Sequence, residues 1–226
     1  MLTTSPMPAP YNTKAVLFDL DGTLADTAPD LAYALNQTLI EAGAAPLPLP
    51  PIRAVASNGS APLITLGFGD KLDEETFEHH RQRLLEIYLD NLTRETTLME
   101  GMASVLKRLE AQNIHWGVVT NKPRRFTDPL MDQLNLTPRA GCIISGDTTA
   151  HAKPHPAPLL HACELLSLSP EACLYVGDAQ RDIEAGQRAG MRTLACRFGY
   201  LAPDDQIERW GADAILEHPE ALLSWI

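Results

Sequence analysis

Residues 15–24 read Ala15-Val-Leu-Phe-Asp-Leu-Asp-Gly-Thr-Leu24, in which four apolar residues run directly into two aspartates. Apolar runs of this kind are typical of strands buried in parallel sheets, and such sheets carry their chemistry at the carboxyl ends of the strands. If the extended conformation persisted as far as Asp21, the carboxyl groups of Asp19 and Asp21 would leave the strand on one face. Two like charges so close require a cation between them or a proton on one of them. Either arrangement suits a site for anions.

The composition is that of an ordinary globular protein. Of the 226 residues, 45% are hydrophobic and 21% are charged. No apolar run approaches the roughly 18 residues of a membrane-spanning helix, so no membrane partner is expected. The formal net charge of -11 argues against a nucleic-acid partner, because nucleic-acid binding depends on a basic surface. A phosphate site in so acidic a protein needs a local positive field from a metal ion, lysines and helix N-termini.

The N-terminus and the cysteines indicate the cellular compartment. Residues 1–13 are rich in Pro, Thr and Ser and lack both the basic start and the apolar centre of a signal peptide. We expect them to form a disordered tail on a cytoplasmic protein. The four cysteines show no CxxC spacing and lie in apolar contexts, which indicates reduced structural thiols.

The segment 27–96 shows no strand signal and predicts a small all-helical insert. Helical patterns run from Asp26 or Thr27 to Gly43 and from about Asp73 to Leu92. Between them lies a proline-rich connection, residues 44–51, that cannot be helical throughout. Residues 57–60, Ser-Asn-Gly-Ser, then interrupt two short helical patterns.

From Gly101 onward, helical and strand patterns alternate. The strands are expected at 115–120, 142–145, 173–178, 192–196 and 212–216, with helices between them and a last helix at the end. This alternation predicts an α/β fold with a doubly wound parallel sheet. The sheet and its helices would form a core domain from 14–26 and 97–226.

Several of these strands end in polar groups that can bind or transfer an anion. The carboxyl ends of parallel strands lie along one edge of a sheet, so groups far apart in the sequence can converge there. The candidate residues are Asp19, Asp21, Thr120, Asn121, Lys153, Asp178 and Asp182.

These residues lie in four motifs that resemble those of the haloacid-dehalogenase-like hydrolases. The motifs are Asp19-Leu-Asp-Gly-Thr23, Val118-Val-Thr-Asn121, Lys153-Pro154 and Gly177-Asp-Ala-Gln-Arg-Asp182, and they occur in the family's order over nearly the whole chain. The resemblance implies a Rossmann-like core with a helical cap, which would be the insert at 27–96.

The resemblance also implies a covalent mechanism. Asp19 would be the nucleophile that becomes an aspartyl-phosphate, and Asp21 would be the general acid and then the general base. Thr120 and the amides around Asn121 would hold a phosphoryl oxygen, while Lys153 neutralises the charge shared by the phosphate and Asp19.

A magnesium site is implied by the same resemblance. Mg²⁺ would be bound by Asp19, the backbone carbonyl of Asp21 and Asp178, and Asp182 would orient one of its water molecules. The cap would close over this site and exclude water. Its loop of Ser57, Asn58, Gly59 and Ser60 would face the part of the substrate that does not react.

Rival classes use similar residues. A receiver-type signalling domain would be about half as long and would lack the cap. A haloacid dehalogenase needs neither Asp21 nor Mg²⁺. A phosphosugar mutase needs a second phosphate site, which the sequence does not reveal.

We therefore expect a Mg²⁺-dependent phosphomonoesterase acting on a small phosphate ester. Residues 19–27, 57–62, 120–123, 153–156 and 198–200 resemble the phosphoglycolate phosphatase branch. Trp210-Gly-Ala-Asp213 and His218-Pro219 near the C-terminus resemble the closely related N-acetylmuramic acid 6-phosphate phosphatases, which are the alternative. Lys122, Arg124 and Arg125 are either surface charge or a rim that steers anionic substrates. A monomer or a homodimer is expected.

Overall fold

Strand β1 (Ala15–Phe18) lies inside a six-stranded sheet whose strand order is β5-β4-β1-β6-β7-β8. The computed structural model describes residues 12–226, so the predicted tail, apart from Asn12 and Thr13, lies outside the described residues. The other strands are β4 (His115–Val119), β5 (Cys142–Ile144), β6 (Cys173–Gly177), β7 (Arg192–Cys196) and β8 (Ala214–Leu216). Every neighbouring pair is parallel, which confirms the predicted fold class.

The alternation of side chains along β1 divides the core between the two faces of the sheet. Val16 and Phe18 pack on one face, together with residues of α5 (Met102–Ala111) and α6 (Arg124–Gln133). Ala15 and Leu17 pack on the other face, with residues of α7 (Ala157–Leu166) and α8 (Gln180–Ala189). All four β1 side chains are 0% exposed, so this strand is covered on both sides.

The strand order reverses next to β1. After β1 the chain passes to β4 and β5 on one side, then returns to β6 on the other side and continues to β7 and β8. Ligands of open α/β sheets bind outside the carboxyl ends of the strands at such a reversal. The turns after β1 and β6 therefore lie where a ligand is expected. The element predicted at the C-terminus is a 3₁₀-helix, Pro219–Trp225.

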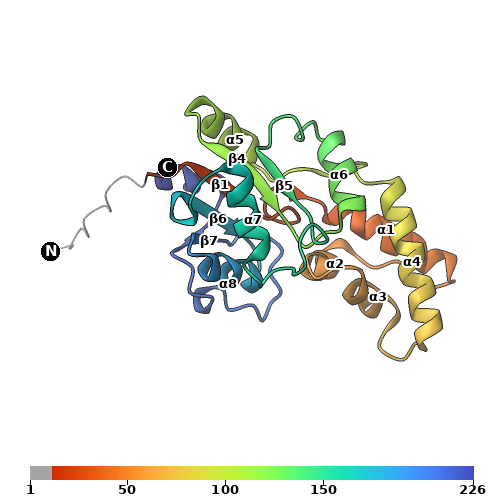
Figure 1. The fold of residues 1–226 in the computed structure, drawn as a ribbon. Coiled ribbons are helices and arrows are strands. Elements are labelled where there is room, and N and C mark those ends of the chain that lie inside the picture. The colour runs from red at the N-terminus through yellow and green to blue at the C-terminus, as the bar shows by residue number, and fades with distance from the viewer. Residues whose placement is uncertain (1–11) are drawn as a thin grey trace.

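Four helices stand beside the sheet (Figure 1, orange to yellow), and we call them the helical insert. They are α1 (Ala28–Glu41), α2 (Leu49–Ala56), α3 (Ser60–Phe68) and α4 (Glu74–Asp90), and α1 packs against the other three. Helix α4 begins where the sequence predicts, because the Asp73 carboxylate accepts the Thr76 backbone N–H at 2.9 Å.

A two-stranded ribbon joins the insert to the sheet. Strands β2 (Ala25–Asp26) and β3 (Thr97–Leu98) are antiparallel, with Asp26 opposite Thr97. Strands of two residues show no periodicity, so the sequence analysis did not predict them. The division into a core (14–26 and 97–226) and a cap (27–96) stays a prediction.

Two further expectations concern the whole chain. All four cysteines, Cys142, Cys163, Cys173 and Cys196, are buried and free, as predicted. None of the helices among the described residues is long and apolar enough to cross a membrane.

Candidate active site

The turn after β1 holds the first pair of predicted site residues. The strand ends at Phe18, and the backbone turns at Leu20, whose carbonyl accepts the N–H groups of Leu24 and Ala25. The extended conformation thus does not persist to Asp21, and Asp19 and Asp21 do not share a strand face. The turn directs the two carboxylates to different partners.

Each of these carboxylates has its own lysine. Asp19 Oδ1 accepts from Lys153 Nζ at 2.9 Å and from the Leu20 N–H at 2.8 Å. Asp21 Oδ1 accepts from Lys122 Nζ at 2.8 Å and from the Thr27 hydroxyl at 2.5 Å. The like charges of the two aspartates are thus compensated separately. Asp19 Oδ2 receives no hydrogen bond from the described residues and is free for chemistry.

Lys153 is the buried cation of the site. Its ammonium group is 2.7 Å from Asp182 Oδ1 and donates to the Val119 carbonyl at 3.0 Å and the Tyr175 hydroxyl at 2.8 Å, besides the contact to Asp19. Burial alone would lower the pKa of Lys153, but Asp182 and Asp19 outweigh it and raise that pKa. The side chain is 0% exposed, so a full positive charge is fixed inside the protein.

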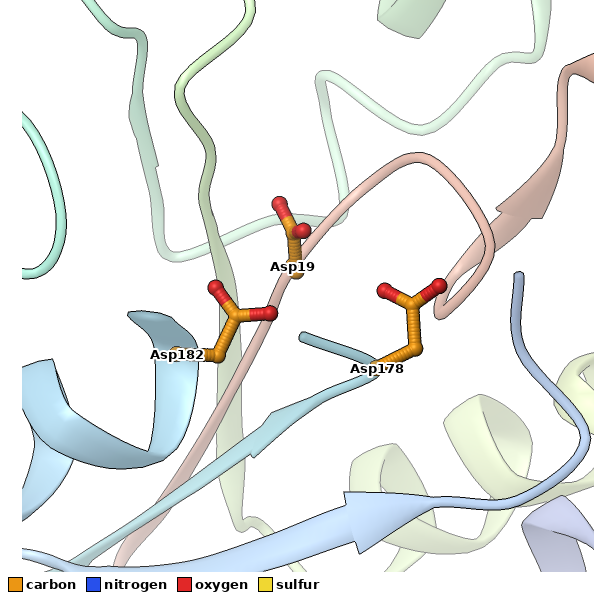
Figure 2. Close-up of side chains that lie close together, drawn as sticks. All are labelled: Asp19, Asp178 and Asp182. Atoms are coloured by element: carbon orange, nitrogen blue, oxygen red, sulfur yellow. The ribbon is translucent and has the colours of Figure 1, made fainter. Parts of the chain in front are cut away.

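The carboxyl groups of Asp19, Asp178 and Asp182 lie close together, as Figure 2 shows. Asp19 follows β1, Asp178 follows β6 and Asp182 stands in the first turn of α8. Each offers an oxygen atom, and these oxygens all lie within 4.8 Å of one another. The three residues are at most 3% exposed. An all-oxygen, carboxylate-rich set is what a hard divalent cation binds.

The pKa values of Asp19 and Asp178 are shifted in opposite directions. Burial raises the pKa of Asp178 to about 7, and the negative charges of Asp19 and Asp182 add to the effect. Burial would also raise the pKa of Asp19, but Lys153 and Arg181 hold it below its ordinary value. The protein's own cations therefore compensate Asp19 and leave Asp178 with excess negative charge. A bound cation would relieve that excess, so the residues fit a metal ion.

Asp178 is fixed in place by two residues from other segments. Its Oδ1 accepts the Thr23 hydroxyl at 3.0 Å, and its Oδ2 accepts the Tyr200 backbone N–H at 2.8 Å. A Cβ atom at Gly22 would lie 2.3 Å from Asp178 Oδ2, and Gly22 has a φ of +81°. Glycine is thus required here both for the turn and for the close approach of the carboxylate.

The second motif positions Lys153 and brings Thr120, a predicted phosphate residue, to the cavity. The Asn121 side chain pairs with the backbone of Lys153 through two bonds of 2.9 Å, one donated by Asn121 Nδ2 and one accepted by Oδ1. Thr120 is 3% exposed and lines the same cavity as Asp19. Asn121 thus links the loop after β4 to the loop that carries Lys153, and this link helps to hold the buried ammonium group in place.

The predicted substrate loop, residues 57–60, contacts the groups that follow the carboxyl ends of β1 and β6, which we call the catalytic edge. Arg181, in the first turn of α8, donates to the Ser57 carbonyl at 2.7 Å and to Asn58 Oδ1 at 3.1 Å. The Ser57 hydroxyl lies 3.2 Å from the Asp21 carbonyl oxygen. At the other end of the loop, Arg81 approaches Ser60 Oγ at 3.4 Å.

A cavity of about 360 Å³ lies between the insert and the sheet edge and is lined by Asp19, Asp21, Thr120, Asn121 and residues 57–60. Its apolar wall consists of Leu31, Leu84, Leu85, Tyr88 and Phe126. The side chains of Arg81, Lys122, Arg125 and Arg181 also line it. An acidic chain thus gathers cations around one cavity.

Sequence reasoning did not assign Tyr175, Tyr200 or Arg181 to the site. Tyr175 lies within a strand and Tyr200 in a loop, and both resemble ordinary core residues. Lys122 was left open between surface charge and a substrate rim, but its side chain is only 8% exposed and is paired with Asp21. The signal for Arg181 was its place between the aspartates of the fourth motif.

Comparison with known proteins gives relatives over most of the chain. A family model described as haloacid dehalogenase-like hydrolase matches residues 16–196. The chain is 44% identical over 206 residues to the N-acetylmuramic acid 6-phosphate phosphatase of Pseudomonas putida, covering 91% of this chain and 92% of that protein. It is 40% identical over 209 residues to the phosphoglycolate phosphatase of Xanthomonas campestris, covering 92% and 94%.

Two further comparisons bear on substrate and fold. The phosphoglycolate phosphatase of the same P. putida strain is 33% identical over 191 residues, which are 83% of this chain and 70% of that protein. The crystal structure of a predicted phosphoglycolate phosphatase from Haemophilus somnus has a TM-score of 0.82 at 28% identity, covering 94% of this chain and 97% of that chain.

Proposed function

The chain belongs to the haloacid dehalogenase-like hydrolases and is a phosphatase, and from that premise we propose that it hydrolyses a sugar-acid phosphate of the N-acetylmuramic acid 6-phosphate type. A comparison within one organism supports this choice, because P. putida has both candidate enzymes. The chain is 44% identical to the N-acetylmuramic acid 6-phosphate phosphatase of that organism and 33% identical to its phosphoglycolate phosphatase.

The cavity supports a substrate with a second anionic group. Among its cations, Lys122 is paired with Asp21 and Arg81 with Glu78, and Arg181 binds the loop at 57–58. Arg125 makes no ion pair with any described residue, and its guanidinium lies over the Phe126 ring at 4.6 Å. N-acetylmuramic acid carries a carboxylate, which a guanidinium can bind through two parallel hydrogen bonds.

Phosphoglycolate is the second candidate. It also combines a phosphate with a carboxylate, and the X. campestris relative of that name is 40% identical to this chain. A cavity of about 360 Å³ with an apolar wall is larger than this small acid needs. The apolar wall suits the faces of a sugar ring and an acetyl group better.

The observation that carries the mechanism is the buried ammonium of Lys153 between Asp19 and Asp182. In the first step Asp19 attacks phosphorus, the bond from phosphorus to the ester oxygen breaks, and the departing oxygen takes a proton from Asp21. In the second step Asp21 takes a proton from water, and that water releases phosphate and regenerates the Asp19 carboxylate. Lys153 keeps Asp19 ionised and balances charge on the phosphoryl group.

The metal proposed for the site is Mg²⁺. Asp19, Asp178 and the Asp21 carbonyl would hold it, and bound there it would offset the negative charge of the phosphoryl group. Asp182 has one oxygen on Lys153 and the other on the Ala179 N–H at 3.0 Å. These two contacts fix Lys153 and the start of α8, and Asp182 would also orient a water molecule of the bound metal. The cytoplasmic location and the monomeric or homodimeric state stay predictions.

A substrate panel tests the proposal. The purified protein with Mg²⁺ should be assayed on N-acetylmuramic acid 6-phosphate, N-acetylglucosamine 6-phosphate, phosphoglycolate and glucose 6-phosphate, with Asp19→Asn as the inactive control. The highest kcat/KM is expected for N-acetylmuramic acid 6-phosphate. The amino sugar without the carboxylate should be clearly poorer. Preference for phosphoglycolate would select the second candidate, and equal rates on all four would remove the carboxylate argument.

A further inference from the structure

Ser57, the first residue of the loop between α2 and α3, reaches the catalytic edge from the helical insert. Its hydroxyl oxygen lies 3.2 Å from the Asp21 carbonyl oxygen and 3.4 Å from Asp178 Oδ2. The proposed function assigns the Asp21 carbonyl oxygen and the Asp178 carboxylate to the metal site. One residue of the insert thus touches two of the three groups expected to hold a cation.

The two hydrogen bonds of the Ser57 hydroxyl are weak by their length. Hydroxyl donors usually stand about 2.5–3.0 Å from their acceptors, so both contacts are long. The hydroxyl carries one proton, so the two acceptors must share it. Neighbouring oxygens around Mg²⁺, with bonds of about 2.0–2.1 Å at right angles, lie about 3 Å apart. The Ser57 oxygen is placed as one more oxygen of such a shell would be.

The loop is also anchored to the core independently of Ser57 Oγ. Arg181 Nη2 donates to the Ser57 carbonyl at 2.7 Å, and Nη1 donates to Asn58 Oδ1 at 3.1 Å. Arg181 directly precedes Asp182 in α8, so the anchor and the carboxylate cluster belong to one short segment. The carbonyl contact fixes the backbone of Ser57 while its hydroxyl faces Asp178.

From these contacts we propose that Ser57 supplies an oxygen of the divalent-cation site, so that metal binding and docking of the insert loop strengthen each other. The inference rests on the proposed function, since it requires the cation site. Coupling of this kind is reciprocal: whatever factor the docked loop adds to metal affinity, the metal adds to loop docking. The insert would then close over a loaded site in preference to an empty one.

Metal binding without substrate tests the inference. Titration calorimetry with Mg²⁺ alone should be run on the wild type, Ser57→Ala and the matched control Ser60→Ala, whose hydroxyl is near Arg81 and not near the carboxylates. Loss of a metal-site oxygen should weaken Mg²⁺ binding about 10-fold or more in Ser57→Ala. Ser60→Ala should stay close to the wild type. Ser57→Thr keeps the hydroxyl and should recover most of the affinity.

Hydrogen exchange provides a second readout, and its wild-type measurement depends on no variant. Mg²⁺ should slow exchange of the backbone amides in residues 57–60, and it should do so in Ser60→Ala but not in Ser57→Ala. The inference is overturned if Mg²⁺ leaves this exchange unchanged in the wild type. It is equally overturned if Ser57→Ala binds Mg²⁺ as tightly as the wild type or more tightly.

Asp178→Asn separates this inference from the proposed function. This variant should lose Mg²⁺ binding whatever Ser57 does, because it removes an anionic ligand of the site. If Asp178→Asn binds Mg²⁺ like the wild type, the cation site itself is wrong and the proposed function fails with it. If Asp178→Asn loses the metal and Ser57→Ala does not, only the role of Ser57 fails.

Discussion

Asp21 is held by Lys122 and Thr27, whereas its neighbour Asp19 is held by Lys153. Only the backbone carbonyl of Asp21 is assigned to the metal. Asp21→Asn should therefore keep the metal site and lose proton transfer. We expect kcat on an alkyl phosphate to fall about 10²- to 10⁴-fold, with a much smaller loss on p-nitrophenyl phosphate, whose leaving group needs no proton. Steady-state assays on both substrates check this, and equal losses would remove the acid role.

Arg125 and Arg124 form a natural pair of test and control. Arg125 lines the cavity, whereas the Arg124 side chain lies near Thr148 at 3.4 Å and does not line it. Arg125→Ala should lower kcat/KM for N-acetylmuramic acid 6-phosphate about 10- to 100-fold, the effect of losing one charged hydrogen bond. It should change little for N-acetylglucosamine 6-phosphate. If Arg124→Ala gives the same loss, general charge steering is the cause.

Asp178 makes the stability of the metal-free protein depend on pH. Its pKa is about 7 in the folded protein, whereas an unfolded Asp titrates near 3.9. Between these values the folded state holds a proton that the unfolded state has released. The contribution of this group to the free energy of unfolding is therefore fully present below about pH 4 and is lost as the pH rises through about 7.

Asp178→Asn should remove this dependence, because the amide does not titrate. With a chelator present, the melting temperature of Asp178→Asn minus that of the wild type should become more positive from pH 5 to pH 8. Thermal unfolding at both pH values measures this difference. An unchanged difference would show that Asp178 does not carry the raised pKa.

At the scale of elements, the loops after β4 and β5 meet backbone to backbone. The Gly146 N–H donates to the Lys122 carbonyl at 2.9 Å, and a Cβ atom at Gly146 would lie 2.1 Å from the Asn121 carbonyl oxygen. Gly146→Ala must therefore displace the second motif. We expect kcat/KM to fall at least about 10-fold on every phosphate ester, acetyl phosphate included, because the shared phosphate site has moved.

Gly43→Ala is the control for this prediction. A Cβ atom there has no neighbour within 4 Å, although φ is +76°. It should cost roughly 1 kcal/mol of stability and leave activity unchanged. Normal turnover in Gly146→Ala would show that the two loops can separate without harm.

The sequence could predict those site residues that follow the ends of the parallel strands. Asp19, Lys153 and Asp178 were assigned to one edge because a parallel sheet brings its strand ends together, and the structure places them there. The pairing of Lys122 with Asp21 was missed, because it depends on the turn at Leu20 and not on periodicity. The contact of Arg181 with the insert loop is set by side-chain reach between elements far apart in the chain, which no local pattern records.

At the scale of the whole molecule, metal binding should appear as stability. Mg²⁺ at 100 times its Kd should add about 2.7 kcal/mol, because it binds the folded state alone. For a chain of this length that is a rise in melting temperature of roughly 5–10 °C over the chelated protein. Differential scanning calorimetry with and without a chelator measures it. An equal rise in Asp178→Asn would place the ion elsewhere.

The ribbon of β2 and β3 brings Asp26 and Thr97 opposite each other, so the chain leaves the core and re-enters it at one point. No strand of the six-stranded sheet comes from between these residues. The two ends of the intervening segment therefore lie next to each other, so the segment can be replaced as one piece. A chimaera that carries another family member's segment between these positions would keep the strand order and the catalytic edge. The chimaera would lose the link that Asp26 makes between the two parts of the chain. Asp26 binds Arg53 of the insert at 2.7 Å and Tyr200 of the core at 2.6 Å. We therefore expect any selection made by residues 57–60 to move with the segment, whereas the predicted phosphate residues and Arg125 of α6 stay in the host.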